Sequence, residues 1–312
     1  MSLVTGASKA PTAVSPFNDS VGYVRAQLRS ALLDARNPDG GWGYSRAHRS
    51  RLEPTSWTLL ALSQAEGGIP DVSPLVRWQP RDHWLLDVLG VSPNITFNAI
   101  AALTLAQAEA GEPLSRALIQ RLSRARGETY VQAPELRQNN GLAAWSWIQG
   151  TISWVEPTAW CLLVLKKHRH TSDERIKDRI ADGEAFLVDR ACAAGGWNYG
   201  NPNVYGTDLI PHVPTTAIAL LAFQDRQTHP VVRAAVARLQ QDAESERSPM
   251  ALALSAMALR RHGVSTERLE SMLTDACLEW HQQADGIENL HASALALCAL
   301  SEIDRPLTAL TL

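Results

Sequence analysis

Two glutamates occupy matching places in two similar stretches of this 312-residue chain. Glu53 opens the stretch Glu-Pro-Thr-Ser-Trp, which ends at Trp57, and Glu156 opens Glu-Pro-Thr-Ala-Trp, which ends at Trp160. The two glutamates lie 103 residues apart. Two carboxyl groups that share one site can act as general acid and general base, because the surroundings of each group set its pKa separately. We therefore take Glu53 and Glu156 as candidate catalytic residues.

The position of each glutamate also supports a plainer interpretation. Each one precedes an apolar segment that is rich in Ala and Leu, which predicts a helix. An acidic residue at the start of a helix interacts favourably with the helix dipole and often caps the helix. Such a setting lowers the pKa of a carboxyl group, which is opposite to what a general acid needs. The sequence thus leaves open a capping or ion-pair role and a role in a cavity.

A third candidate set lies in a long loop, residues 200–214, which is rich in Gly and Pro. It exceeds the roughly 2–8 residues that usually join packed helices, and such long loops often carry function. Asp208 and His212 are the candidate acid–base residues of this loop, and Tyr205 is a candidate ligand contact. Trp57 and Trp160 are further candidate ligand contacts, since an aromatic face can stabilise a carbocation. Packing between helices is the alternative role for both tryptophans.

The elements that must position these residues form an internal repeat. Trp42 and Trp145 are separated by 103 residues, the same offset that separates the two glutamates. Weaker copies complete six units, with apolar inner helices expected to begin near residues 55, 96, 158, 215, 249 and 293. Helices that are apolar on nearly all sides must be buried by their neighbours.

Outer helices with one charged face are expected between the inner ones, over residues 21–34, 114–126, 173–189, 230–241 and 266–282. The stretch 78–91 is expected to be the outer helix of the second unit, with an exposed membrane-surface patch as the alternative. One layer of buried helices lined by one layer of amphipathic helices makes a double-walled, all-α array.

The Trp-bearing turns resemble those of the terpene cyclase and prenyltransferase toroid family. Triterpene cyclases carry the pattern aromatic-aliphatic-x3-Gln-x3-Gly-x-Trp. Residues 186–197 fit this frame with Ala191 in place of Gln, and residues 32–42 fit it with Arg36 in that place. The resemblance covers roughly residues 20–305 and implies a closed (α/α)6 barrel with six inner and six outer helices. An open helical solenoid is the structural alternative.

The usual catalytic groups of that family are missing. Class II terpene cyclases use an Asp-x-Asp-Asp acid, and at the best-matching place, residues 212–215, this chain has His-Val-Pro-Thr. Class I cyclases use Asp-Asp-x-x-Asp, which is also absent. Protein prenyltransferase β-subunits hold zinc with Asp-x-Cys and a later His, which Asp275, Cys277 and His291 match superficially. Because Asp275 and Cys277 are expected on different faces of one outer helix, we expect no metal and no cofactor.

Charge and composition indicate which classes of partner and which compartment suit this chain. A net charge of −3, from 29 basic and 32 acidic residues, gives no basic face for nucleic acid. No apolar run approaches the roughly 18 residues of a transmembrane segment. Four dispersed cysteines without a Cys-x-x-Cys pair indicate reduced thiols in a cytoplasmic protein. We expect residues 1–17 to form a flexible tail and residues 18–312 a single toroid domain.

These features predict a terpene cyclase-like toroid whose central cavity is apolar at depth and acidic at its mouth. Such a protein would bind or convert an isoprenoid or another apolar ligand by acid–base chemistry without the usual aspartates. A catalytically inactive toroid that binds a lipid or a protein partner is the alternative. A carbohydrate-active barrel is a third interpretation, because paired acids and tryptophans also suit glycosides.

Overall fold

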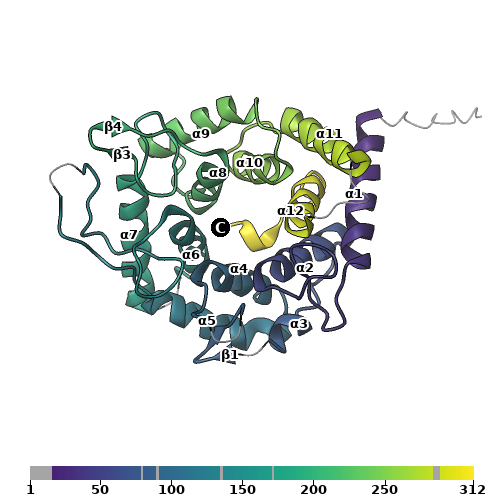
Figure 1. Ribbon diagram of the computed structural model, residues 1–312, viewed down its shortest axis with the longest axis horizontal. Coiled ribbons are helices and arrows are strands. Elements are labelled where there is room, and N and C mark those ends of the chain that lie inside the picture. Colours follow the sequence, from purple (N-terminus) through teal and green to yellow (C-terminus); the bar gives the residue numbers. More distant parts are fainter. Residues whose placement is uncertain (1–15, 79, 89–90, 134–135, 171, 284–288) are drawn as a thin grey trace, which may run out of the picture.

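The computed structural model describes residues 16–312 except 79, 89–90, 134–135, 171 and 284–288. Most of the expected N-terminal tail, residues 1–15, lies outside the described residues. Six inner helices follow one another around a ring: α2 (Leu52–Glu66), α4 (Ile95–Leu105), α6 (Val155–Lys167), α8 (Val213–Ala222), α10 (Pro249–Arg261) and α12 (Leu290–Ser301). Each packs against the next, and α12 packs against α2 (Figure 1). The ring is therefore closed, which confirms the toroid and excludes the open solenoid.

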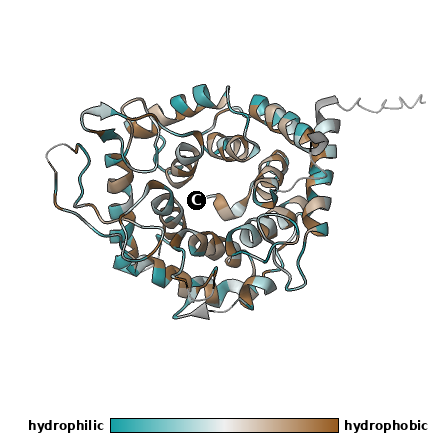
Figure 2. Cartoon of the chain, viewed as in Figure 1, coloured by the Kyte–Doolittle hydropathy of each residue, from teal (hydrophilic) through white to brown (hydrophobic). Residues whose placement is uncertain are grey.

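Five long outer helices surround the ring: α1 (Pro16–Asp34), α5 (Glu112–Arg124), α7 (Glu174–Asp189), α9 (Pro230–Ala243) and α11 (Glu267–Gln283). They turn apolar faces toward the ring and polar faces outward (Figure 2). The inner helices begin within three residues of the expected positions. About 56% of the described residues are helical. In the part of the chain that the structure describes, no helix is long and apolar enough to cross a membrane.

The expected outer helix over Trp78–Val91 is wrong. The sixth outer position holds only the short helix α3 (Ser73–Val76) and the 3-10 turn η1 (Glu109–Gly111), and strands β1 (Pro80–Arg81) and β2 (Trp84–Leu85) form a hairpin. Asp82 and His83 both have positive φ, at 50° and 64°, which makes a tight turn and not a helix. Trp84 and Leu85 are buried, so this stretch is not an exposed apolar patch either.

The Gly-Trp turns are packing elements of the fold. Trp42, Trp145 and Trp197 are at most 1% exposed. Each indole N–H donates to a main-chain carbonyl at the end of a preceding outer helix, those of Leu32, Leu122 and Leu187, at 2.6–2.8 Å. Each backbone N–H donates to a threonine hydroxyl of the following inner helix, on Thr55, Thr158 and Thr216. Every turn thus ties an outer helix to the next inner one.

Residues 305–312, which we call the closing segment, enter the centre of the ring and include the 3-10 turn η2 (Thr308–Leu310) (Figure 1). Polar side chains at the carboxyl ends of five inner helices bind it: Gln64, Gln107, Lys167, Gln224 and Arg261. Lys167 Nζ lies 2.8 Å from the carbonyl oxygen of Thr308, for example. Leu307, Ala309 and Leu310 are buried. The closing segment therefore fills the ring at the carboxyl ends of the inner helices.

Candidate functional site

The candidate site lies at the opposite end of the ring, where the inner helices begin. The closing segment binds their carboxyl ends, so their amino ends face the other way. The second residues of the inner helices are Glu53, Thr96, Glu156, Pro214, Met250 and His291. Four of these, Glu156, Pro214, Met250 and His291, keep partial solvent exposure, whereas the middle turns of the inner helices are buried. We call this face the amino end of the ring.

Glu53 is held by Tyr44 and His291. Its Oε2 accepts a hydrogen bond of 2.6 Å from the Tyr44 hydroxyl, and its Oε1 lies 3.9 Å from His291 Nε2. Burial lowers the pKa of His291 more than the charge of Glu53 raises it, so the imidazole is neutral at neutral pH. Burial and the charge of Glu53 raise the pKa of Tyr44, which keeps its hydroxyl as a donor. Glu53 therefore has a fixed orientation and no cationic partner at His291.

The start of α2 is fixed by an ion pair behind this cluster. Arg51 pairs with Asp87 through its Nε at 2.8 Å and through a second guanidinium nitrogen. Asp87 also accepts a bond of 2.7 Å from the backbone N–H of Leu52. The guanidinium of Arg51 lies over the Tyr44 ring, 5.5 Å from its centroid. The ion pair thus supports the tyrosine that orients Glu53.

Glu156 is the chemically unusual group of the site. Its pKa is raised to about 8, mainly because surrounding protein removes the carboxyl group from water and secondly because of the negative charge of Glu53. A hydrogen bond from the Trp160 side chain acts in the opposite direction. The expectation that a helix start lowers this pKa is therefore wrong, because desolvation outweighs the helix dipole. At neutral pH Glu156 is a protonated acid that keeps partial solvent exposure.

Neither glutamate caps its helix. Arg51 and Trp154 occupy the N-cap positions of α2 and α6, and neither of these caps has a side-chain cap hydrogen bond. Glu53 bonds to the Tyr44 side chain instead. The capping interpretation is therefore wrong for both glutamates, and the negative charge of Glu53 acts instead on the carboxyl group of Glu156.

Trp57 and Trp160 meet one turn further into the ring. Their ring centroids are 5.5 Å apart with an interplanar angle of 67°, which is an edge-to-face contact. They belong to α2 and α6, which are separated by α4, so the contact crosses the inside of the ring over α4. Their exposure is 1% and 2%. The pair fills the middle of the ring below the glutamates and forms an aromatic floor under the amino end.

Asp208 and Tyr205 of the long loop lie in a hairpin of their own. Strands β3 (Asn203–Val204) and β4 (Thr207–Asp208) form a hairpin in it. Asp208 is exposed and pairs with Arg137 at 2.9 Å and Asn203 at 2.8 Å. Tyr205 is 82% exposed at the tip of this hairpin. The structure therefore keeps Asp208 and Tyr205 in the exposed hairpin, where Asp208 is bonded to Arg137 and Asn203.

His212 and the zinc-like set occupy other surroundings. His212 precedes α8 and contacts Tyr199 edge to face, with centroids 4.7 Å apart, at a hollow of about 290 Å³. Asp275 is exposed and Cys277 is buried, so the two side chains lie apart as the helical spacing predicted. His291 instead contacts Glu53.

Sequence reasoning missed the roles of Tyr44 and His291 at Glu53. The sequence contained a signal for both residues. Tyr44 closes the Gly-Trp-Gly-Tyr turn nine residues before Glu53, and His291 occupies the second position of the last inner helix, which is the repeat position of both glutamates. Aligning all six helix starts, including the weak ones, would have brought these residues together.

Comparisons with known proteins agree with the fold. No family model and no curated protein matches this sequence. Among solved structures, a family 76 glycoside hydrolase from a bovine Bacteroides thetaiotaomicron strain is similar with a TM-score of 0.62 and 9% identity, covering 91% of this chain and 77% of that one. The type II terpene cyclase MstE from Scytonema is similar with a TM-score of 0.57 and 13% identity, covering 92% and 98%.

A protein from Actinoplanes is also similar, with a TM-score of 0.56, 18% identity and coverage of 90% and 98%. At these identities the likenesses show the fold alone. Terpene cyclases and glycosidases share this toroid, so the chemistry has to be argued from the residues of this chain.

Proposed function

We propose that the amino end of the ring is an acid–base site in which Glu156 donates a proton to an unsaturated, isoprenoid-like substrate. The observation that carries this proposal is the pKa of Glu156, raised to about 8 beside Glu53 and Trp160. A carboxylic acid that stays protonated at neutral pH is the requirement for a general acid. The terpene cyclase neighbour, solved with geranylgeranyl dihydroxybenzoate, supports the choice of an isoprenoid-like substrate.

The proposed reaction uses only side chains of this site. The π electrons of a substrate double bond take the proton of Glu156, which forms a C–H bond, breaks the O–H bond and leaves a carbocation and a carboxylate. Trp160 and Trp57 lie below this position, where aromatic faces stabilise positive charge. Glu53, oriented by Tyr44, then accepts a proton from the carbocation and a new double bond forms. Exchange of protons with water restores both glutamates.

The experiment is product analysis with a panel of polyprenyl diphosphates and squalene-type substrates. We expect an isomerised or cyclised product from the natural protein and its loss in Glu156→Gln, because an amide donates no proton of comparable acidity. Glu244→Gln, a change at an exposed glutamate outside the site, is the matched control and should retain the product. Product formation that is equal in Glu156→Gln and in the control would overturn the proposal.

Hydrolysis of a glycosidic bond is the second candidate function. It is favoured by the raised pKa of Glu156 in the presence of the negative charge of Glu53. Glycosidases pair a protonated acid with a carboxylate that acts as base or nucleophile. Release of nitrophenol from a panel of nitrophenyl glycosides, with the same two variants, distinguishes this chemistry from the first.

A binding module without catalysis is the third candidate. It is favoured by the contact of Trp57 with Trp160, which fills the middle of the ring, and by the closing segment, which fills its carboxyl end. A native mass spectrum of freshly purified protein tests this function, because a retained lipid would add its mass to the chain. Turnover of a substrate that depends on Glu156 would contradict it.

A further inference from the structure

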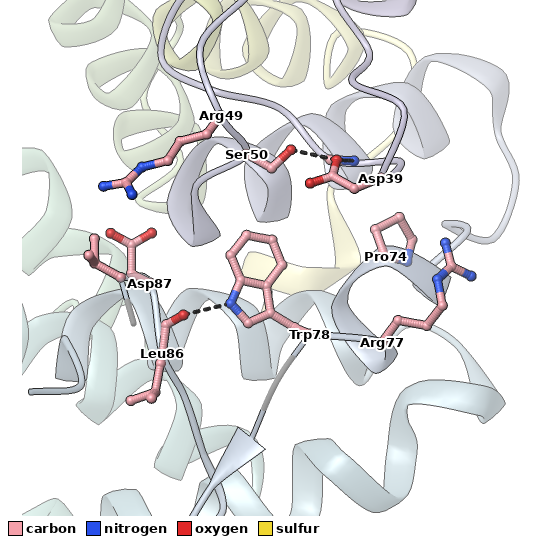
Figure 3. Close-up of a pocket in the computed structure, with 10 residues that line it drawn as sticks. Asp39, Arg49, Ser50, Pro74, Arg77, Trp78, Leu86 and Asp87 are labelled. Atoms are coloured by element: carbon pink, nitrogen blue, oxygen red, sulfur yellow. Dashed lines mark hydrogen bonds between the residues drawn. The ribbon is translucent and has the colours of Figure 1, made fainter. Parts of the chain in front are cut away.

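A cleft of about 490 Å³ lies between the first Gly-Trp turn and the segment that contains the hairpin β1–β2 (Figure 3). Residues Asp39, Gly41, Arg49 and Ser50 line one wall, and the other is lined by Pro74, Arg77, Trp78, Leu86, Asp87 and Val88. A volume of this size is typical of sites for small molecules. The cleft is lined by neither Glu53 nor Glu156, so it is separate from the acid–base site.

The floor of the cleft is apolar and flat. Trp78 stands in its middle, partly exposed, and its indole N–H donates a hydrogen bond of 2.8 Å to the carbonyl oxygen of Leu86 (Figure 3). Pro74, Leu86 and Val88 extend the apolar surface around it. The hydrogen bond fixes the orientation of the indole, and a fixed aromatic face stacks favourably on another ring.

One carboxylate of the cleft wall is free to bind a donor. Asp39 Oδ1 accepts hydrogen bonds from the Ser50 hydroxyl at 2.7 Å and from the backbone N–H of Gly41 at 3.0 Å. Among the described residues, Asp39 Oδ2 has no hydrogen-bond partner. The first oxygen therefore holds the side chain in place, and the second remains available to a hydroxyl or amine of a ligand.

Two arginines flank Trp78 on opposite sides of the cleft, Arg49 beside Asp87 and Arg77 beside Pro74 (Figure 3). In the described part of the chain neither guanidinium is paired with an acidic residue. Asp87 is bound by Arg51 and by the backbone N–H of Leu52, so its charge is already compensated. The uncompensated charge of the cleft is therefore positive.

The Arg77 side of the cleft has a second cation close by. A methyl group on Gly40 would lie 3.4 Å from a guanidinium nitrogen of Arg36 and 3.5 Å from one of Arg77. Arg36 also pairs with the exposed Asp71 at 3.2 Å. Two guanidinium groups close to one glycine, of which that of Arg77 has no acidic partner among the described residues, make this side the more favourable place for an anion.

We propose that this cleft binds a small molecule that consists of a flat ring with a phosphate or carboxylate group. The ring stacks on Trp78, the anionic group pairs with Arg77, and a hydroxyl or amine of the ligand donates to Asp39. This second site does not depend on the acid–base function proposed for the amino end of the ring.

The test is binding to the full chain by titration calorimetry. Phenyl phosphate and benzoate carry ring and anion together, whereas phenol and inorganic phosphate carry one part each. We expect saturable binding of phenyl phosphate or benzoate at least tenfold tighter than that of either part, and the comparison of the two distinguishes a phosphate site from a carboxylate site. Arg77→Gln should weaken this binding at least tenfold.

Arg233→Gln, a change at an exposed arginine of α9, is the matched control and should leave the affinity unchanged. Trp78→Leu should also abolish the advantage of phenyl phosphate over inorganic phosphate, provided that circular dichroism shows a folded ring. Binding of inorganic phosphate as tight as that of phenyl phosphate would overturn the proposal. Equal affinity in Arg77→Gln and Arg233→Gln, or no binding of either complete probe, would overturn it as well.

Discussion

Trp57 and Trp160 contact each other edge to face, 5.5 Å between centroids, although another inner helix separates the helices that carry them. This contact crosses the inside of the toroid over α4, between its two ends. Above it, at the amino end, lie the two glutamates with Tyr44 and His291. Below it, the closing segment fills the ring. The aromatic pair and the closing segment therefore occupy the inside of the ring, where the sequence predicted a deep apolar cavity.

The unfolding free energy should depend on pH through Glu156. Its carboxyl group ionises near pH 4.5 in the unfolded chain and near pH 8 in the folded one, so the folded state is stabilised below pH 4.5 and loses this stability as the pH rises toward 8. Glu156→Gln removes the dependence. We expect the stability of the variant relative to the natural protein to rise by roughly 2–4 kcal/mol from pH 4.5 to 8, allowing for partial solvent screening. Urea unfolding at several pH values measures it, and a difference that stays constant with pH would contradict it.

Glu53→Gln should lower the pKa of Glu156. The negative charge of Glu53 is the second cause of the raised pKa after burial, so removing it makes ionisation of Glu156 easier. Carbon-detected NMR of isotopically labelled glutamate carboxyl groups measures the titration, and Glu156→Gln assigns the signal. We expect a midpoint below about 8 in Glu53→Gln. The exposed change Glu112→Gln should leave the midpoint where it is. An unmoved midpoint in Glu53→Gln would mean that burial alone sets the pKa.

Trp197→Ala should destabilise the fold by about 3–5 kcal/mol, because it empties a fully buried position. It also removes the indole hydrogen bond of 2.7 Å to Leu187 and the stacking on Phe223. The free energy of unfolding in urea checks this value. Trp280→Ala, at a partly exposed tryptophan of α11, is the control and should cost clearly less. A loss below about 1 kcal/mol for Trp197→Ala would show that the Gly-Trp turns are not structural plugs.

Lys167→Met should cost about 1–3 kcal/mol, because two carbonyl oxygens of the closing segment lose their donor. Burial, and secondly the charge of Arg261, lower the pKa of Lys167, so part of the loss is offset by removing a desolvated charge. Lys177→Met changes an exposed lysine that pairs with Glu174 and should stay within about 0.5 kcal/mol. Thermal unfolding compares the two variants, and equal melting temperatures would show that the closing segment is held by its apolar side chains alone.

Much of the fold was predictable, because the repeat is visible in the sequence as short motifs at a constant spacing. The offset shared by Trp42 with Trp145 and by Glu53 with Glu156 gave the register, and apolar segments gave the inner helices. The second outer helix was not predictable from apolar content alone. The stretch around Trp84 is as apolar as a helix face, but Asp82 and His83 take left-handed conformations, and the side chain of Asn98 binds the main chain of Leu85 at 2.8 and 3.0 Å. That pairing is a tertiary contact.

The sequence predicted the two glutamates of the candidate site, but not the direction in which the pKa of Glu156 is shifted. Repeat symmetry brought Glu53 and Glu156 to one end of the ring, and the helix dipole argument then gave the wrong direction for the pKa of Glu156. The burial of Glu156 and the effect of Glu53, a glutamate that is distant in the sequence, exist only once the ring has closed. The long loop misled for a related reason, since the hairpin around Tyr205 turns outward and Asp208 finds its partner in Arg137.

The closure of the ring between α2 and α12 has a consequence for biosynthesis. α2 is made early, and four further inner helices leave the ribosome before α12 can pack against it. α1 also lacks its main packing partners until late in synthesis, because it packs on α11 and α12. An open solenoid can add units one at a time onto a finished edge, but this chain keeps the apolar sides of its first helices uncovered during most of translation. We therefore expect the apolar surface of the first helices to remain uncovered until α12 has packed against α2.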